Sequence, residues 1–416
     1  KVTPKLSLDS SGKGEIILPI KSRTFISMQI GDSVLFNFLV EPGFDLKYII
    51  NEKSTMIKGN GSNENIYFQL IQPLISALNK RSDSLIEVKA SVDKLLQTFN
   101  ETEIKLTKLF NNYTDSFNIN EINKYILKNG TLSTILLQKQ KCLLSIENAL
   151  IDSLSLYNKF GLIYNPIFKD TILIKTKYIN FLNFLIYNFE QTIGNKIFKR
   201  NPKNNIYPIL LFGSINNDQK YSERIKEFLL YAELTTELVE NGINNTLENT
   251  CEVFFDVFKN SEYSKLLKKR ISNYKPLSKD SPAPGFWGRS LSGKQISISD
   301  YKGKVLLIDI WATWCKPCIS EFSYTDQILM PLTKNNDFVI IYASIDRDKN
   351  KWKTFVTKSN LARGINIVIE DKIVLDKYKI SGVPRYILIN KDGLIVNAFC
   401  EKPSLGTLKN RIKEIL

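Results

Sequence analysis

The stretch VLLIDIWATWCKPCISE, residues 305–321, decides the fold of the C-terminal part of the chain. Its unbroken apolar run, Val305 to Ile310, has the length and branching of a buried strand. Cys315 and Cys318 follow at once, and the residues after them favour a helix. The first sulfur is therefore expected at a helix N-terminus, where unpaired N–H groups and the helix dipole stabilise a thiolate. The pattern predicts a reactive dithiol.

Composition limits the classes of function. The chain has 416 residues, room for two or three domains, and its 43% apolar residues suffice for real cores. The net charge of +15 brings nucleic acid into consideration, but arginine is scarce beside lysine and no basic-aromatic alternation occurs, so we expect a solvated surface and no nucleic-acid partner. The chain contains no histidine, which excludes Cys-His and Ser-His dyads and histidine-bound metals, and we expect no cofactor and no metal.

The remaining cysteines are interpreted individually. Five cysteines are too few for a disulfide scaffold, and the odd number leaves at least one unpaired in a monomer. Cys142 and Cys251 lie in helical patterns, which favours buried free thiols, although a disulfide between them stays open. Cys400 ends the last predicted strand, where an inert thiol is favoured over a third redox thiol.

The sequence shows no membrane-spanning or export segment. It begins at Lys1 with neither an initiator Met nor a signal-peptide pattern, so we expect a mature or trimmed product. The most apolar segment, 178–189, is interrupted by asparagines and predicts a core helix rather than a membrane span.

Pattern changes divide the chain into four parts. We expect a β-rich domain, a small sandwich, in residues 1–62 and an α-helical domain in residues 63–275. Residues 276–290 are a Pro- and Gly-rich linker, and we expect an α/β layered domain in residues 291–416. The N-terminal strands are expected at 15–18, 25–28, 34–40 and 46–50. Later helices are expected at 119–160, 166–199, 219–241 and 245–273, with breaks at Asn129-Gly130 and Asn201-Pro202. In the last domain, strands are expected at 305–311, 338–345, 385–390 and 394–399, and helices at 316–332, 349–358, 371–378 and 405–416.

The C-terminal residues resemble a known family. The resemblance is carried by the string Trp311–Cys318, with Asp309 before it and Glu321 after it, and by Gly382-Val383-Pro384 before a strand. These residues resemble the TlpA/ResA-like thiol–disulfide oxidoreductases of the AhpC/TSA-redoxin superfamily. The resemblance covers about residues 280–416 and implies a thioredoxin fold. Residues 38–45 resemble the β modules that precede such redoxins in multidomain proteins of Bacteroidota.

The resemblance implies catalytic roles. Cys315 is the nucleophile and Cys318 resolves the mixed disulfide. Asp309 matches the buried acid that takes a proton from the resolving cysteine, and the alternative is a structural polar residue paired with a lysine. Glu321 matches the glutamate that tunes the thiols, and an ordinary exposed glutamate is an equal alternative. Because ResA-like proteins often carry an amide in place of Asp309, the division of proton transfer between the two acids is open.

Further residues are expected to tune the thiols or to bind substrate. Lys316 adds positive charge beside the nucleophile, and Pro317 fits the first helical turn. The resemblance makes Pro384 a cis-proline whose neighbour Val383 pairs with a substrate strand. Two more substrate-binding candidates are Trp314, expected to cover the nucleophile, and Arg385, which either favours acidic substrates or points to solvent.

Two functions are weighed. The first is an exported thiol–disulfide oxidoreductase that acts in the bacterial cell envelope or periplasm. It would reduce disulfide-bearing proteins with electrons from a DsbD/CcdA-like membrane thiol reductant. Whether a removed N-terminal segment anchors it to the membrane, by a lipid or otherwise, stays open. The second is an envelope assembly protein whose thioredoxin domain is a redox switch or docking unit. A peroxiredoxin is disfavoured, because Ala312 holds the place of its threonine and a CxxC follows.

Overall fold

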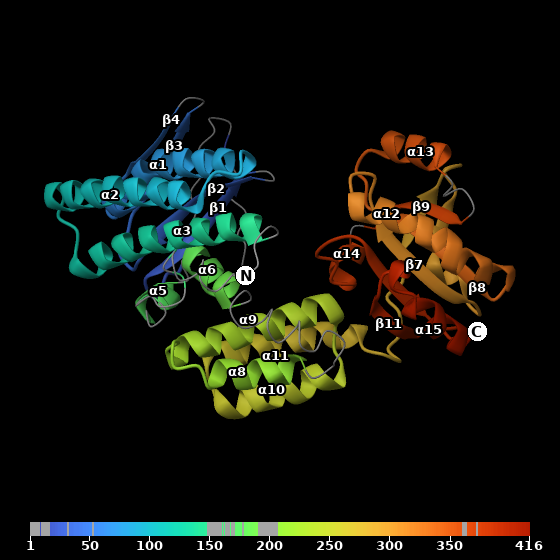
Figure 1. The fold of residues 1–416 in the computed structure, drawn as a ribbon. Helices are drawn as coiled ribbons and strands as arrows, with labels where there is room; N and C mark the ends of the chain where they lie inside the picture. Colours follow the sequence, from blue (N-terminus) through green and yellow to red (C-terminus); the bar gives the residue numbers. More distant parts are fainter. Residues whose placement is uncertain are drawn as a thin grey trace. The chain divides into compact units, whose positions relative to one another are not determined.

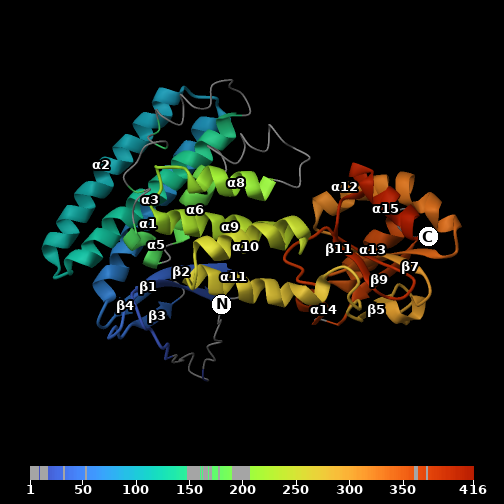
Figure 2. The same ribbon diagram turned by 90° about the horizontal axis from the view of Figure 1, so that it is seen from below.

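The fold was analysed in a computed structural model. It describes residues 9, 17–30, 33–51, 54–147, 160, 162, 167, 171–176, 179–189, 207–359, 364–371 and 373–416. The chain divides into two compact units, one made of residues 1–204 and 213–229, the other of residues 205–212 and 230–416. Figures 1 and 2 show the helices and strands of the chain. The four-part division expected from the sequence stays a prediction.

The first unit opens with two separate antiparallel strand pairs. β1 (Thr24–Ile30) pairs with β2 (Ser33–Val40), and β3 (Lys47–Asn51) pairs with β4 (Ser54–Lys58). Three of the predicted strands are present, whereas β4 was not predicted and residues 17–18 of the expected first strand are not in a strand. Residues 15–16 lie outside the described residues. The two pairs form separate two-stranded sheets, so the predicted sandwich is not confirmed.

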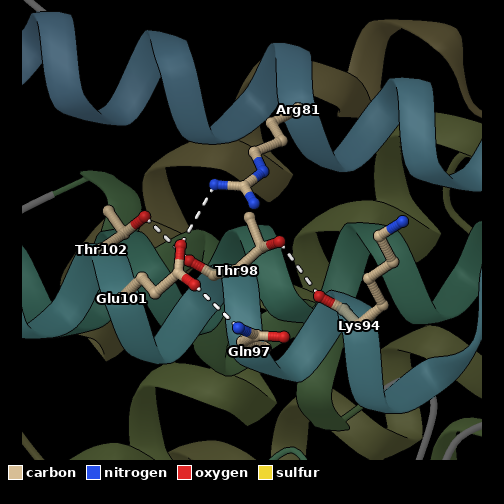
Figure 3. Close-up of polar contacts among 6 residues, drawn as sticks. All are labelled: Arg81, Lys94, Gln97, Thr98, Glu101 and Thr102. Atoms are coloured by element: carbon tan, nitrogen blue, oxygen red, sulfur yellow. Dashed lines mark hydrogen bonds and ion pairs between the residues drawn. The ribbon is translucent and has the colours of Figure 1, made fainter.

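Helices follow the strands in the described part of the first unit. They are α1 (Ser62–Glu87), α2 (Val92–Ser116), α3 (Glu121–Glu147), α5 (Thr171–Thr176) and α6 (Ile179–Phe189). The first three pack side by side (Figure 1). Asn65 fastens α1 to β2, since its side-chain amide exchanges 2.9 Å hydrogen bonds with the backbone N–H and C=O of Leu39. Arg81 of α1 donates to a carboxylate oxygen of Glu101 of α2 at 3.1 Å, and Gln97 donates to the other oxygen at 3.0 Å. Figure 3 shows these contacts.

The predicted break at Asn129-Gly130 is wrong, because α3 passes through both residues. Glycine weakens a helix interior by only about 1 kcal/mol. The buried side chains of Ile126 and Leu127 on one side, and Ile135 on the other, hold this part of the helix in place. Packing therefore outweighs the local cost. The other predicted break, Asn201-Pro202, lies outside the described residues.

A second group of helices leads into the second unit. It contains α8 (Tyr207–Asn216), α9 (Glu223–Asn241), α10 (Asn245–Val257) and α11 (Glu262–Tyr274), and the boundary between the units falls within α8 and α9. The single helix predicted over 245–273 is wrong. The chain turns at Asn260, whose φ is 59°, and Ser261 then caps α11 by accepting a hydrogen bond from the Ser264 N–H. None of the described helices has the length and hydropathy needed to cross a membrane.

The C-terminal domain is a seven-stranded sheet with the order β11-β10-β7-β8-β9-β5-β6. The strands are β5 (Trp287–Ser290), β6 (Gln295–Ser297), β7 (Val305–Trp311), β8 (Phe338–Ser344), β9 (Ile365–Ile369), β10 (Arg385–Ile389) and β11 (Ile395–Cys400). β7, β8 and β9 run parallel, and β10 is antiparallel to β7. The α/β layered fold is confirmed, although β5, β6 and β9 were not predicted.

Helices α12 (Lys316–Tyr324), α13 (Lys349–Lys358) and α15 (Thr407–Ile415) pack their apolar side chains into one core with alternate residues of the sheet. A short helix, α14 (Ile373–Lys377), precedes β10. The long helix predicted over 316–332 is wrong beyond Tyr324: a π turn covers Thr325–Leu329 and a 3₁₀ turn covers Met330–Lys334. Pro331 lacks a backbone N–H and cannot continue the α-helical pattern there.

The segment predicted as a linker is hydrogen-bonded to the last hairpin. After a 3₁₀ turn, Lys275–Leu277, the Asp280 N–H donates to the Ile395 carbonyl at 2.8 Å. The Ile395 N–H donates to the Ser281 carbonyl, also at 2.8 Å, and the Ala283 N–H to the Gly393 carbonyl at 3.0 Å. These bonds run along β11 and the turn before it, so part of the linker is built into the domain.

Candidate active site

Cys315 and Cys318 form a disulfide at the start of α12. Cys315 is the N-cap, and its sulfur accepts a 3.1 Å hydrogen bond from the Cys318 N–H. This donor is one of the N–H groups that a helix start leaves unpaired, and it favours a thiolate once the disulfide is reduced. The Cys315 side chain is 4% exposed and Cys318 is fully buried. A partner can therefore reach only the first sulfur.

The loop that faces the disulfide carries a cis peptide bond. This bond joins Val383 to Pro384, as the resemblance implied. The Val383 carbonyl lies 3.6 Å from the Cys315 sulfur. Beside it, Trp314 is 61% exposed, and Lys316 and Pro317 are also exposed. An exposed indole next to the accessible sulfur supplies apolar contact area, so its predicted role in substrate binding is retained as a proposal.

Asp309 lies in the middle of β7 and is 1% exposed. Within the described residues, neither of its carboxyl oxygens has a hydrogen-bond partner. Burial, and secondarily the charge of Glu321, raise the pKa of Asp309 well above its ordinary value. These surroundings favour the neutral carboxyl group, which therefore exchanges its proton at a higher pH than usual. No lysine in the described part of the chain pairs with it.

Glu321 lies on α12, one turn after Cys318, and is 7% exposed. Its carboxylate accepts a 3.0 Å bond from the Ser404 N–H and a 2.8 Å bond from the Ser404 hydroxyl. Ser404 belongs to a 3₁₀ turn, Pro403–Leu405, that follows β11. The glutamate is therefore not the exposed helix residue that the sequence left as an alternative. Its hydrogen bonds come from a residue that sequence reasoning missed.

Two buried tyrosines neighbour the acids. Tyr386 of β10 lies opposite Asp309 in the sheet, and Tyr342 of β8 lies opposite it on the other side. Burial, with the charge of Asp309 as the next cause, raises the pKa of both phenols. Within the described residues, the Tyr386 hydroxyl has no hydrogen-bond partner. Both tyrosines looked like ordinary strand residues in the sequence, and only the strand register reveals their place.

A third buried acid, Asp346, holds the loop before Cys315. Its carboxylate accepts the Thr313 N–H at 2.9 Å, the Thr313 hydroxyl at 2.8 Å and the Ser344 hydroxyl at 2.7 Å. The Ile345 N–H also donates to the Trp311 carbonyl at 2.9 Å. The active-site loop is thus tied to the end of β8. Sequence reasoning missed this contact, because only the parallel pairing of β7 and β8 brings the residues together.

Arg385, a predicted substrate-binding residue, is buried. It is 9% exposed, donates to the Val239 carbonyl of α9 and lies over the ring of Phe399. The guanidinium does not point to solvent, and its predicted contact with acidic substrates stays a prediction. Cys142, Cys251 and Cys400 are free thiols. Burial raises the pKa of Cys251 and of Cys400 to about 12, which disfavours a reactive thiolate at either position.

Comparisons with known proteins agree with this geometry. The profile of the Redoxin family matches residues 278–414. The thiol-disulfide oxidoreductase ResA of Bacillus thuringiensis is 33% identical over 133 residues, 32% of this chain and 76% of the relative. ResA of Bacillus subtilis is 33% identical over 123 residues, 29% of this chain and 66% of the relative. The chain belongs to the TlpA/ResA-like family.

Among solved structures, the thioredoxin domain of a thiol-disulfide oxidoreductase from Bacteroides vulgatus is 28% identical, covers 34% of this chain and 99% of its own, and has a TM-score of 0.31. A thiol:disulfide interchange protein from Bacteroides sp. is 29% identical, covers 33% of this chain and 90% of its own, and has a TM-score of 0.30. The TlpA/ResA-like protein described here is a thiol–disulfide oxidoreductase with a thioredoxin fold, and Cys315 and Cys318 form its CxxC pair.

Proposed function

We propose that the enzyme reduces disulfide bonds of exported proteins. The observation that carries the proposal is the position of Cys315, whose sulfur accepts an N–H at the start of α12 beside the exposed Trp314. In the dithiol form, the Cys315 thiolate attacks a substrate disulfide, a new S–S bond joins enzyme to substrate, and one substrate thiolate leaves. Cys318 then attacks the Cys315 sulfur, the second substrate thiol leaves, and two electrons have passed to the substrate.

Proton transfer accompanies the second step. Cys318 must lose its proton to attack, and the buried Asp309 is the proposed acceptor because its oxygens have no competing donors within the described residues. Glu321, held by Ser404, is proposed to tune this transfer through its charge. Val383 and Pro384 are proposed to bind the extended substrate chain, with Trp314 covering the sulfur. Lys316 and Pro317 are proposed to favour the thiolate and stiffen the turn.

The setting of the reaction is also a proposal. The chain is expected to act in the bacterial periplasm or cell envelope, to be reloaded by a DsbD/CcdA-like membrane thiol reductant, and to be held at the membrane by an anchor. The proposal of this setting rests on the similarity to ResA. The helices before residue 276 are proposed to choose the protein partner.

Stoichiometric reduction of insulin by the prereduced protein tests the proposal. Wild type should reduce the disulfides, and Cys315→Ala should be inactive. Cys400→Ser should match wild type, since the pKa of its thiol is raised to about 12, which disfavours a reactive thiolate. The reduction potential of the pair gives the direction of electron flow: a value near −270 mV indicates a reductant and a value near −120 mV an oxidant. An inactive wild type, or a potential near the oxidant value, contradicts reduction. Retained activity in Cys315→Ala contradicts the dithiol cycle.

A further inference from the structure

The side chain of Arg385 is buried between two parts of the second unit. Its Nη2 donates to the Val239 carbonyl at 3.1 Å, and its Cζ lies 4.2 Å from the centre of the Phe399 ring. An arginine stays charged under physiological conditions, and burying a charge without partners is costly. The carbonyl belongs to the last turn of α9, where the helix dipole is negative, and the ring face is also attractive to a cation.

The Phe399 ring is enclosed by the same group of helices. A Cβ on Gly242 would come within 2.4 Å of the ring, and the φ of Gly242 is +71°, so both space and conformation require glycine there. On another side, the ring of Tyr274 stacks on Phe399 with a centroid separation of 6.0 Å. The ends of α9 and α11 thus close on β10 and β11. We call Val239, Gly242, Tyr274, Arg385 and Phe399 the helix seat.

The helix seat begins one residue after the loop that faces the disulfide. Arg385 follows Pro384 directly, and the Val383 carbonyl lies 3.6 Å from the Cys315 sulfur. The backbone of Arg385 is fixed by its place opposite Ile310 in the sheet. The end of α9 is therefore within the reach of one arginine side chain from the substrate-facing loop.

We propose that Arg385 is a positioning residue that holds the end of α9 beside the Val383-Pro384 loop, and that this helix end forms part of the surface selecting protein disulfides over small ones. The inference rests on the proposed function. It assigns to the C-terminal part of the helical region a role in partner choice, exerted through the helix seat rather than through direct contact of Arg385 with substrate.

The test alters Phe399, which lies in the seat but has no part in the thiol chemistry. Phe399→Ala removes the ring from Arg385, Gly242 and Tyr274. Val396→Ala is the matched control: it shortens an apolar side chain of the same strand that packs against the core containing α12 and α15. Two measurements are made on the full chain. Hydrogen exchange follows the Gly242 amide, which donates to the Leu238 carbonyl, and kinetics compare insulin with glutathione disulfide.

For Phe399→Ala we expect faster hydrogen exchange at the Gly242 amide. The rate of insulin reduction should fall by about tenfold, and the rate with glutathione disulfide should change by less than about twofold. The reason is that only the protein substrate depends on the position of the α9 end. Val396→Ala should leave the ratio of the two rates as in wild type. If exchange at Gly242 is unchanged in Phe399→Ala, the helix seat does not hold the end of α9. If exchange is faster but the ratio of the two rates is unchanged, the end of α9 does not select between the substrates. If wild type reduces neither disulfide, the proposed function fails, while the exchange data still decide whether the seat holds α9.

Discussion

Asp309 and Asp346 are buried acids at adjacent strands, and their surroundings differ completely. Asp346, at the end of β8, accepts three hydrogen bonds from Thr313 and Ser344. Asp309, inside β7, accepts none within the described residues and has a pKa raised by burial. Hydrogen bonds stabilise a carboxylate, while their lack favours the protonated acid. The comparison shows that the same side chain holds a loop at one position, while at the other it lacks hydrogen-bond partners among the described residues and is the proposed proton acceptor.

The largest effect should come from Asp309→Asn, which keeps the shape and removes the titrating group. We expect disulfide reduction to slow by about a hundredfold, the lower end of the range for general acid–base catalysis. The rate should also lose the pH dependence that Asp309 gives it. Stopped-flow kinetics over a range of pH check this, with the exposed Asp392→Asn as control. If Asp309→Asn reduced disulfides at the wild-type rate, Asp309 would not be the proton acceptor in the reaction.

The same variant should be more stable than wild type at alkaline pH. Because the pKa of Asp309 is raised in the folded protein, folding favours the protonated acid. Its contribution is fully present below the unfolded value, near 3.8, and is lost as pH rises through the folded pKa. Asparagine does not titrate, so the gain in free energy of unfolding for Asp309→Asn should grow across that interval. Urea denaturation at several pH values measures it, and a gain that is constant with pH contradicts the assignment.

Removing one donor from Asp346 should weaken the fold. Thr313→Val deletes the hydroxyl with little change of shape and leaves a buried carboxylate oxygen with one partner fewer, at a cost of about 1–2 kcal/mol in the free energy of unfolding. Thr313→Ser keeps the hydroxyl and should cost clearly less. Denaturant titration of the two variants compares them. Equal losses in both would mean that the methyl group, and not the hydrogen bond, accounts for the effect.

The smallest expected effect concerns Glu321→Gln. The charge of Glu321 is the second cause of the raised pKa of Asp309, after burial. Removing it should lower that pKa and move the midpoint of the pH–rate profile to lower pH. Glu414→Gln, an exposed change on α15, should leave the midpoint in place. A shift to higher pH would show that the two acids interact differently from the arrangement described.

Local patterns explain what the sequence could predict. The apolar runs of β7 and β8 and the cysteine spacing carry their own signal, and α13 was predicted with the bounds that the structure has. Short strands were missed, because β5 and β6 have three or four residues with little apolar pattern. The CxxC pair and the cis bond at Pro384 are present as the resemblance implied.

Contacts between distant residues explain what the sequence could not predict. Ser404 is 83 residues from Glu321, and Val239 is 146 residues from Arg385. No spacing rule connects such pairs, since only the folded sheet and its turns bring them together. The catalytic roles of the site residues stay predictions, and the variants above address them.

The hydrogen bonds between residues 280–283 and the last hairpin bear on the design of shorter proteins. β11 is the outermost strand on its side of the sheet, and an open strand edge is a template for aggregation. The segment before β5 covers part of that edge through Asp280, Ser281 and Ala283. A truncated domain begun at residue 291 would expose this edge and also lose β5 from the opposite side. A soluble thioredoxin domain should therefore begin before residue 278.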